Sequence, residues 1–468
     1  MKKSRSLAVF VLPLILFAAA LPPPTRTELQ TKAELGDPGA QVELGNAYRL
    51  GSAGIPDNGA AVRWYRQAAA QGNARAQFNL GVMYEHGDGV PRYIAEAVKW
   101  YRQAADQGYA AAQCNLGVMY ADGVGVPQDS ATAVAWWRRA AEQGDAEAQT
   151  NLGEMYARGV GVPQDKSVAL QWFRRSAEQG SANARYSVGR IYDNGFGVVP
   201  QKGEAATWYR QAAEQGHLDA QKRLGEMYAK GQGVPLNRAE AEKWWRRAAG
   251  QGDGGAQYSL GVMFANGAGV AQDFAQAMSW YRKAAAQDLP EAKSNLGAMY
   301  EHGQGVPPDS AEAVRWYRQA AEQDLAEAQY NLGSLYARGE GVPPDSAMAV
   351  RWYRQAAEQG SAEAQTALGL MFARGDRVPS NRGEARLWLR QAAEQGFVPA
   401  MHHLGVVLLN AATPDRAEAY TWLFAASALG SAPSRDLLHA LEGKLTREEI
   451  VAAEKSARAR IEQLPKNE

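Results

Sequence analysis

Cysteine is almost absent from this chain, since Cys114 is the only one in 468 residues. No intramolecular disulfide can form, so burial of apolar side chains must hold the fold together. Net charge is absent as well, because 50 Lys and Arg residues balance 50 Asp and Glu residues. This balance removes the electrostatic attraction on which nucleic-acid binding depends, and we expect no nucleic-acid partner.

Histidine is also scarce, with six residues that are dispersed along the chain and show no metal-ligand spacing. A catalytic site needs unlike groups that converge in one pocket, and the sequence brings no such set together. We therefore predict no catalytic residues, no metal site and no cofactor, and we expect that the protein is not an enzyme.

A long apolar run occurs once, between Leu7 and Leu21, after the basic residues Lys2, Lys3 and Arg5. The run ends in small residues and is shorter than the roughly 20 residues that span a bilayer, which is typical of a signal peptide. We predict a signal peptide over residues 1–20 and a linker over 21–36, with an uncleaved anchor as the alternative. The expected location is the periplasm, with secretion as the alternative, and no stable membrane insertion is expected after cleavage.

What the sequence does contain is a period of 36 residues. The pair Leu-Gly recurs at this interval, with Val188 in place of leucine once, and a tryptophan recurs in step. The leucines are Leu44, Leu80, Leu116, Leu152, Leu224, Leu260, Leu296, Leu332, Leu368 and Leu404. The tryptophans are Trp64, Trp100, Trp136, Trp172, Trp208, Trp244, Trp280, Trp316, Trp352 and Trp388. Such regularity predicts a repeat array.

Each repeat contains the pattern of two helices. Leu80, Met83 and Tyr84 form one apolar stripe at helical spacing, and Trp100 and Tyr101 belong to a second. One such hairpin cannot bury both stripes alone, so stacked repeats must share a continuous core. We expect the tryptophans to fill the space between repeats and the arginine that follows each Trp-Tyr pair to be solvated.

Polar residues mark the expected helix starts. Asp129, Asp165, Asp273, Asp309 and Asp345 are placed to cap second helices, and Asn73, Asp145, Ser181, Asp253 and Ser361 to cap first helices. Asp288 and Asp324 stand where other repeats have a helix-ending glycine.

The repeat strongly resembles the Sel1-like repeat, a relative of the tetratricopeptide repeat. One good instance runs from Ala328-Gln329 through Gly341-Val342-Pro343 and Trp352-Tyr353-Arg354 to Gly360. The resemblance implies an all-α, right-handed α-α superhelical solenoid of about eleven repeats over residues 37–430, followed by a C-terminal helical cap over residues 431–468.

The same resemblance implies function. It indicates a non-enzymatic scaffold or adaptor that binds a protein or peptide along the concave face of the solenoid, in the bacterial cell envelope. The alternative is the β-lactamase-like or penicillin-binding activity of the cysteine-rich branch of the family. That branch carries a cysteine pair in each repeat, whereas this chain has Cys114 alone.

Candidate partner-binding residues lie on the first helix of each repeat. At 100° per residue, positions 78 and 82 point away from the Leu80 stripe, and in tetratricopeptide-like superhelices this face lines the groove. The apolar candidates are Phe78, Val82, Tyr258, Val262 and Tyr330. A central basic and aromatic patch, suited to an acidic segment, consists of Arg185, Tyr186, Arg190, Lys222 and Arg223. The open alternative is that these side chains pack against neighbouring helices.

Overall fold

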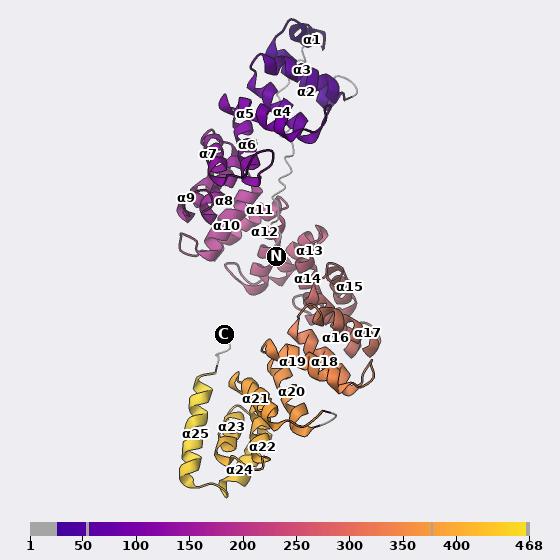
Figure 1. Cartoon of the computed structure of the whole chain (residues 1–468), viewed down its shortest axis with the longest axis vertical. Coiled ribbons are helices and arrows are strands. Elements are labelled where there is room, and N and C mark those ends of the chain that lie inside the picture. Colours follow the sequence, from indigo (N-terminus) through magenta and orange to yellow (C-terminus); the bar gives the residue numbers. More distant parts are fainter. Residues whose placement is uncertain (1–25, 53–55, 376–377, 465–468) are drawn as a thin grey trace. The chain divides into compact units, whose positions relative to one another are not determined.

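The computed structural model describes residues 26–52, 56–375 and 378–464, and all regular structure in this part of the chain is helical. The predicted signal peptide lies outside the described residues. The described chain divides into two compact units, residues 1–236 and 237–468, which are treated separately below. Figure 1 shows the helices of each unit.

The first unit contains twelve of the described helices. They are α1 (Arg26–Glu34), α2 (Pro38–Leu50), α3 (Asn58–Ala70), α4 (Ala74–His86), α5 (Ile94–Asp106), α6 (Ala110–Asp122), α7 (Ser130–Glu142), α8 (Ala146–Arg158), α9 (Lys166–Glu178), α10 (Ala182–Asn194), α11 (Lys202–Glu214) and α12 (Leu218–Lys230). From α1 to α12, each helix of this unit packs against the one that follows it within the unit.

The second unit contains thirteen described helices. They are α13 (Arg238–Gly250), α14 (Gly254–Asn266), α15 (Phe274–Ala285), α16 (Pro290–His302), α17 (Ser310–Ala321), α18 (Ala326–Arg338), α19 (Ser346–Glu358), α20 (Ala362–Arg374), α21 (Arg382–Glu394), α22 (Val398–Leu409), α23 (Arg416–Ala428), α24 (Ala432–Glu442) and α25 (Arg447–Glu462). The even-numbered helices α2 to α22 are the first helices of the repeats, and α3 to α23 are the second helices.

The predicted helix ends are confirmed. All ten polar residues named as N-caps accept a hydrogen bond from the backbone at the start of their helix. Asp288 and Asp324 adopt the left-handed conformation at φ 68° and 62°, as the glycines that they replace do. Asp288 is held in place by Lys293, whose ammonium group donates to its carboxylate.

The glycine of the Leu-Gly pair lets a side chain of the second helix pack directly on the first helix. The ring of Tyr101 packs directly on Gly81, where a Cβ atom would lie 2.7 Å from the nearest ring carbon. Tyr101 is fully buried as a result. The side chain that uses this space is the residue after the tryptophan, which is aromatic on Gly81 and leucine on Gly369 and Gly405.

The tryptophans have a different place. Trp100 is half-buried and packs against an apolar cluster that joins Tyr65 of the preceding repeat with Leu80 and Met83 of its own repeat. The expectation that tryptophans fill the space between repeats is confirmed. They are not the deepest side chains, however, because the residue one position along, such as Tyr65 or Tyr101, is more buried.

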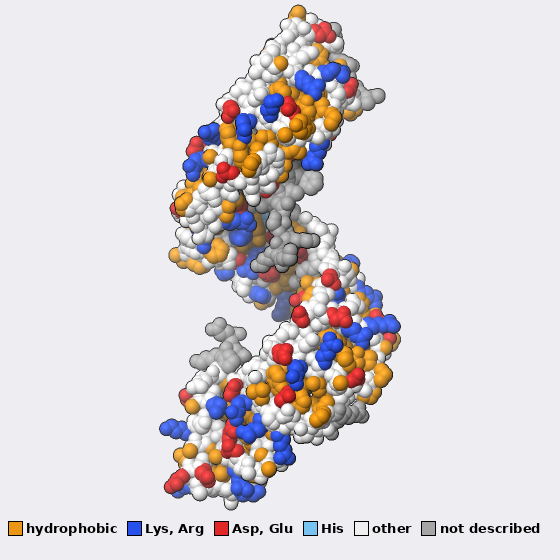
Figure 2. Space-filling model, viewed as in Figure 1, with side chains coloured by type: hydrophobic (Ala, Val, Ile, Leu, Met, Phe, Trp, Pro, Cys, Tyr) orange, Lys and Arg blue, Asp and Glu red, His pale blue; other side chains and the backbone are white. Residues whose placement is uncertain are grey.

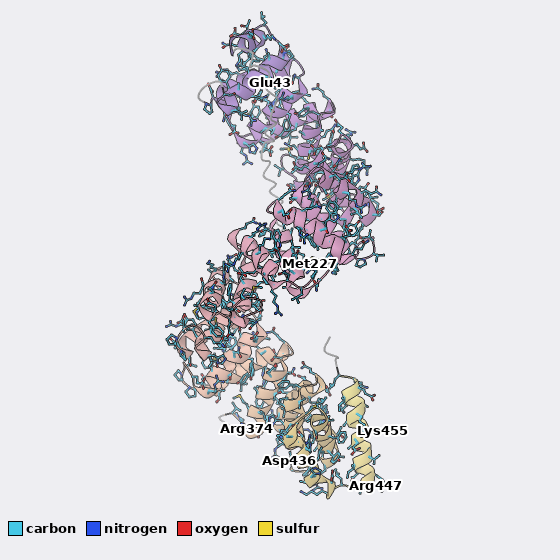
Figure 3. The ribbon with its side chains drawn as sticks, turned by 180° about the vertical axis from the view of Figure 1, so that it is seen from behind. Glu43, Met227, Arg374, Asp436, Arg447 and Lys455 are labelled. Carbon is cyan, nitrogen blue, oxygen red and sulfur yellow. The ribbon has the colours of Figure 1, made fainter. Side chains whose placement is uncertain are left out.

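The two ends of the array carry additional helices. Residues 26–34, which the sequence analysis placed in a linker, form α1, and Ala33 of this helix is buried against Ala40 and Leu44. At the other end α25 packs against α23, where the guanidinium carbon of Arg460 lies 4.6 Å from the ring centroid of Trp422. Figure 3 shows α25 beside the last repeat, with Arg447 at its start.

Candidate functional site

The candidate site is the face of the first helices. Two rows of residues run across it at 36-residue intervals. We call the fifth residue of each first helix the inner row: Val42, Phe78, Cys114, Thr150, Tyr186, Lys222, Tyr258, Ser294, Tyr330, Thr366 and His402. We call the ninth residue the outer row: Asn46, Val82, Val118, Glu154, Arg190, Glu226, Val262, Ala298, Ser334, Leu370 and Val406.

The inner row is packed rather than open to solvent. Val42, Cys114, Ser294 and Thr366 are buried, and the other members are half-buried. The aromatic members pack on the buried aromatic residue of the second helix in the same way each time. The ring centroids are 5.6 Å apart for Phe78 and Tyr101, 5.8 Å for Tyr258 and Tyr281, and 5.7 Å for Tyr330 and Tyr353. The packing alternative therefore applies to the inner row, although its half-buried members, Tyr258 and Tyr330 among them, retain accessible surface.

The outer row retains accessible surface. Arg190 is exposed and every other member is half-buried. Val82 and Val262 lie at the rims of the apolar clusters that contain Tyr101 and Tyr281, respectively. Apolar side chains thus reach the surface at the same helix position in several repeats. Figure 2 shows hydrophobic side chains gathered on the surfaces of both units.

The central basic and aromatic patch is only partly as predicted. Tyr186 stacks on His217 with ring centroids 4.4 Å apart, and the guanidinium carbon of Arg190 lies 5.8 Å from the centre of the Tyr186 ring. Lys222 is half-buried one repeat further on. Arg185 does not join this group, because its Nε donates to the carbonyl of Ala177 at 3.2 Å.

Acidic groups beside the patch neutralise the charge of one of its members, Arg223. Arg223 donates through Nε to Asp193 at 2.7 Å and through Nη1 to Glu226 at 2.8 Å, and Lys202 donates to Asp193 at 2.5 Å. Although burial favours the neutral acid, the bonds from Arg223 and Lys202 hold the pKa of Asp193 below its usual value. The patch is therefore less basic than its sequence suggested.

Cys114 is not placed to react with a ligand. Its side chain is buried in α6, and burial raises the pKa of the thiol well above its usual value. Its backbone carbonyl accepts a hydrogen bond from Trp137 Nε1 at 3.1 Å. Among the residues that the structure describes, no group of three or more His, Cys, Asp and Glu side chains could hold a metal ion.

Sequence reasoning missed a row of glutamines at the junctions between repeats. Gln113 donates to the carbonyl of Ala105 at 3.0 Å, and its own side-chain oxygen accepts from Gln143 at 2.8 Å. The glutamine pair recurs as Gln41–Gln71, Gln77–Gln107, Gln149–Gln179, Gln257–Gln287, Gln329–Gln359 and Gln365–Gln395. The sequence contains a pattern that could have revealed this row, because two glutamines recur 30 residues apart. Arg185 occupies one of these positions, which explains its bond to a carbonyl.

A second missed contact uses the arginine that was expected to be solvated. Arg138 donates through Nη2 to the hydroxyl of Tyr156 in the next repeat at 2.7 Å. The same bond recurs between residues 18 apart for Arg66, Arg102, Arg174, Arg210, Arg282 and Arg318. Where Phe264 lacks the hydroxyl, Arg246 lies 5.5 Å from the ring centroid instead.

Comparison with known proteins identifies the repeat. The model of the Sel1 repeat matches eleven successive segments: residues 38–73, 74–109, 110–145, 146–181, 182–217, 218–253, 255–289, 290–325, 326–361, 362–397 and 398–431. The chain belongs to the Sel1 repeat family. No curated protein matches the chain.

Two solved structures are similar over much of this Sel1 repeat protein. One is c5321, a protective antigen of uropathogenic Escherichia coli strains with an SLR fold. It is 36% identical with a TM-score of 0.85, over 93% of this chain and 94% of that one. The other is a Sel1 repeat protein of Oxalobacter formigenes, 35% identical with a TM-score of 0.52, over 66% of this chain and 89% of that one.

Membership of the family also indicates a general type of function. Sel1 repeats are protein-interaction modules, and the fold is typically a non-enzymatic scaffold. In the described part of the chain, no helix combines the length and apolar character that crossing a membrane requires.

Proposed function

We propose that this protein is an exported, non-enzymatic scaffold of the bacterial cell envelope that holds a protein or peptide against the face of its first helices. The observation that carries the proposal is the outer row. Val82, Val118, Val262, Leu370 and Val406 occupy the same helix position and remain half-buried. Apolar side chains that recur at one accessible position are suited to contact with a partner.

The N-terminal sequence supports the location. Residues 1–20 have the basic start, apolar run and small residues of a signal peptide. The relative c5321 is a protective antigen, and we take this as further support for export. Sequencing the amino terminus of the protein from a periplasmic fraction tests this part; an intact Met1 in a cytoplasmic fraction would contradict it.

The contact surface is tested by affinity purification from the native cell, followed by mass spectrometry. We expect the double substitution Val82→Glu with Val118→Glu to remove a set of proteins that the unmodified chain retains. The matched control is Leu387→Glu, because Leu387 is 52% exposed on the second helix α21 and so lies off the proposed face. Retention of the same proteins by all three chains would refute the proposed surface.

A further inference from the structure

Three glutamates extend the first-helix face of the second unit. Glu291, Glu327 and Glu363 are each the second residue of their helix, in α16, α18 and α20, and all three are exposed. Among the described residues, none of them forms an ion pair, and Glu363 accepts only the hydroxyl of Ser361 at 3.0 Å. We call these three residues the glutamate row.

The structure of the first unit indicates where such side chains reach. Arg75 holds the equivalent position in α4, and its guanidinium group bonds to Glu43 on the preceding first helix at 2.6 Å. The second residue of a first helix therefore lies over its neighbour, on the face that carries the inner and outer rows. The position does not require an acid in every repeat, because Asn183 and Gly255 occupy it in α10 and α14.

The glutamate row lies close to the aromatic part of this face. Burial raises the pKa of Tyr258, and the negative charges of Glu291 and Glu327 raise it further. Two carboxylates from successive repeats thus act on one half-buried tyrosine ring. Tyr330 and Leu370 continue the apolar surface along α18 and α20.

Basic side chains on these helices do not neutralise the glutamate row. Lys293 is buried and bound to Asp288. Arg338 ends α18 and is bound to Glu301 at 2.7 Å and Glu340 at 2.9 Å. Arg374 is the last residue of α20, at the opposite end of the helix from Glu363 (Figure 3). The amino-terminal half of the face is therefore acidic.

We propose that the first-helix face of α14 to α20 binds a polypeptide segment that carries Lys or Arg side chains beside apolar ones. This proposal rests on the scaffold function proposed above and names the chemistry of the partner. The basic side chains pair with the glutamate row, while the apolar ones cover Tyr258, Val262 and Leu370.

Two labelled synthetic peptides test the proposal by fluorescence anisotropy with the full chain. One repeats the unit Lys-Leu-Ser-Gly four times, and the other has Glu in place of Lys. We expect the basic peptide to bind and the acidic peptide to bind far more weakly. Combining Glu291→Gln, Glu327→Gln and Glu363→Gln should weaken binding of the basic peptide about tenfold, since each exposed ion pair contributes roughly 0.2–1 kcal/mol.

The matched control removes three negative charges, also 36 residues apart, from the second helices. Glu322, Glu358 and Glu394 are exposed at the ends of the second helices α17, α19 and α21. Their triple change to glutamine should leave the affinity unchanged. Equal binding of the two peptides, no binding of the basic peptide, or an equal loss in the control would each overturn the proposal. If the Val82 and Val118 substitutions abolish binding of the native partner while the peptide experiments give one of these contrary results, the proposed partner chemistry is wrong and the scaffold function stands.

Discussion

At the scale of single residues, the packing of an aromatic ring on glycine sets the spacing of the two helices in a repeat. Gly261 lies against Tyr281, and a Cβ atom added to it would lie 2.5 Å from the ring. Because the neighbour is a fully enclosed ring, the helices would have to move apart. The contact recurs on Gly81, Gly117, Gly153, Gly189, Gly297 and Gly333, so the same constraint applies along the array.

We expect Gly261→Ala to destabilise the protein by about 1–3 kcal/mol, because the added methyl group overpacks the junction. The control is Gly250→Ala, since nothing lies within 4 Å of the Cβ position there and the residue is helical. That change should be neutral or stabilising by up to about 1 kcal/mol. Urea denaturation followed by circular dichroism compares the two; equal midpoints would contradict the expected overpacking.

A second prediction at this scale concerns pH. His217 caps α12 by accepting the backbone N–H of Ala220 on Nδ1 at 3.2 Å, which requires an unprotonated nitrogen. Burial lowers the pKa of His217 below its usual value of 6.5, against an opposing effect of Asp219. The unfolded chain therefore binds the proton more readily, so this stability is present above pH 6.5 and is lost as the pH falls below it.

We expect the melting temperature of the unmodified chain to fall more between pH 7.5 and pH 5 than that of His217→Asn, because asparagine caps a helix without titrating. His402 and His403 also have lowered pKa values from burial, and they contribute equally in both proteins. Burial raises the pKa of the neighbouring Tyr186 above its usual value of 10, so its hydroxyl keeps its proton throughout this range. Parallel pH profiles would show that the cap does not respond to protonation.

At the scale of helices, a glutamine on the first helix of a repeat bonds both to the preceding repeat and to the second helix of its own repeat. Gln113 satisfies the carbonyl of Ala105 at the end of α5 and binds Gln143 at the end of α7. Replacing it by leucine removes both bonds, although the carbonyl of Ala105 keeps its bond from the N–H of Gly108 at 3.0 Å and Gln143 keeps its bond to the carbonyl of Arg139 at 3.3 Å. We expect Gln113→Leu to cost about 1–3 kcal/mol, since each of the two lost bonds contributes about 0.5–1.5 kcal/mol.

Hydrogen exchange locates this effect. Amides at the ends of α5 and α7 should exchange faster in Gln113→Leu, while those of distant helices in the same unit change least, because repeats interact mainly with their neighbours. Gln171→Leu is the control, since Gln171 is exposed on α9 and receives the same chemical change. Faster exchange throughout the unit in both variants would argue against a local junction.

The helices themselves follow from the sequence, whereas the orientation of their faces does not. Leucine spacing, caps and glycines were sufficient to locate both helices of each repeat. A helical wheel centred on Leu80 places Phe78 on the solvent side, because it assumes that the helix has a single buried stripe. In the structure each interior first helix packs between two second helices, so its buried arc is wider and includes the inner row. A single helix pattern contains no information about the second neighbour.

At the scale of the whole molecule, the carboxyl-terminal end of the array is closed by α25. Ala457, Ile461 and Leu464 cover the cluster around Trp422, and Thr446 and Glu449 form a capping box at the start of the helix. The outward residues are charged, among them Lys455, which Figure 3 places midway along α25. A terminal repeat needs such a polar outer layer to remain soluble.

Deleting residues 447–468 should therefore expose Trp422 and lower the unfolding midpoint of the last repeats, with increased binding of a hydrophobic dye. Lys455→Glu serves as the control, because it changes the charge of α25 while leaving the buried alanines in place. Dye fluorescence and the denaturation curve are measured for both the deletion and the control. An unchanged denaturation curve after the deletion would mean that α25 does not shield the last repeat from solvent.

The bond from arginine to tyrosine has a consequence for how such proteins change length. It joins residues 18 apart, and the glutamine pair joins residues 30 apart. Both distances are shorter than one 36-residue period. Excising one complete period from the interior would bring together an arginine and a tyrosine that fit each other as well as their former partners did. Gene duplication and deletion can therefore lengthen or shorten the array in whole steps wherever the joined repeats carry both the arginine–tyrosine and the glutamine pairs.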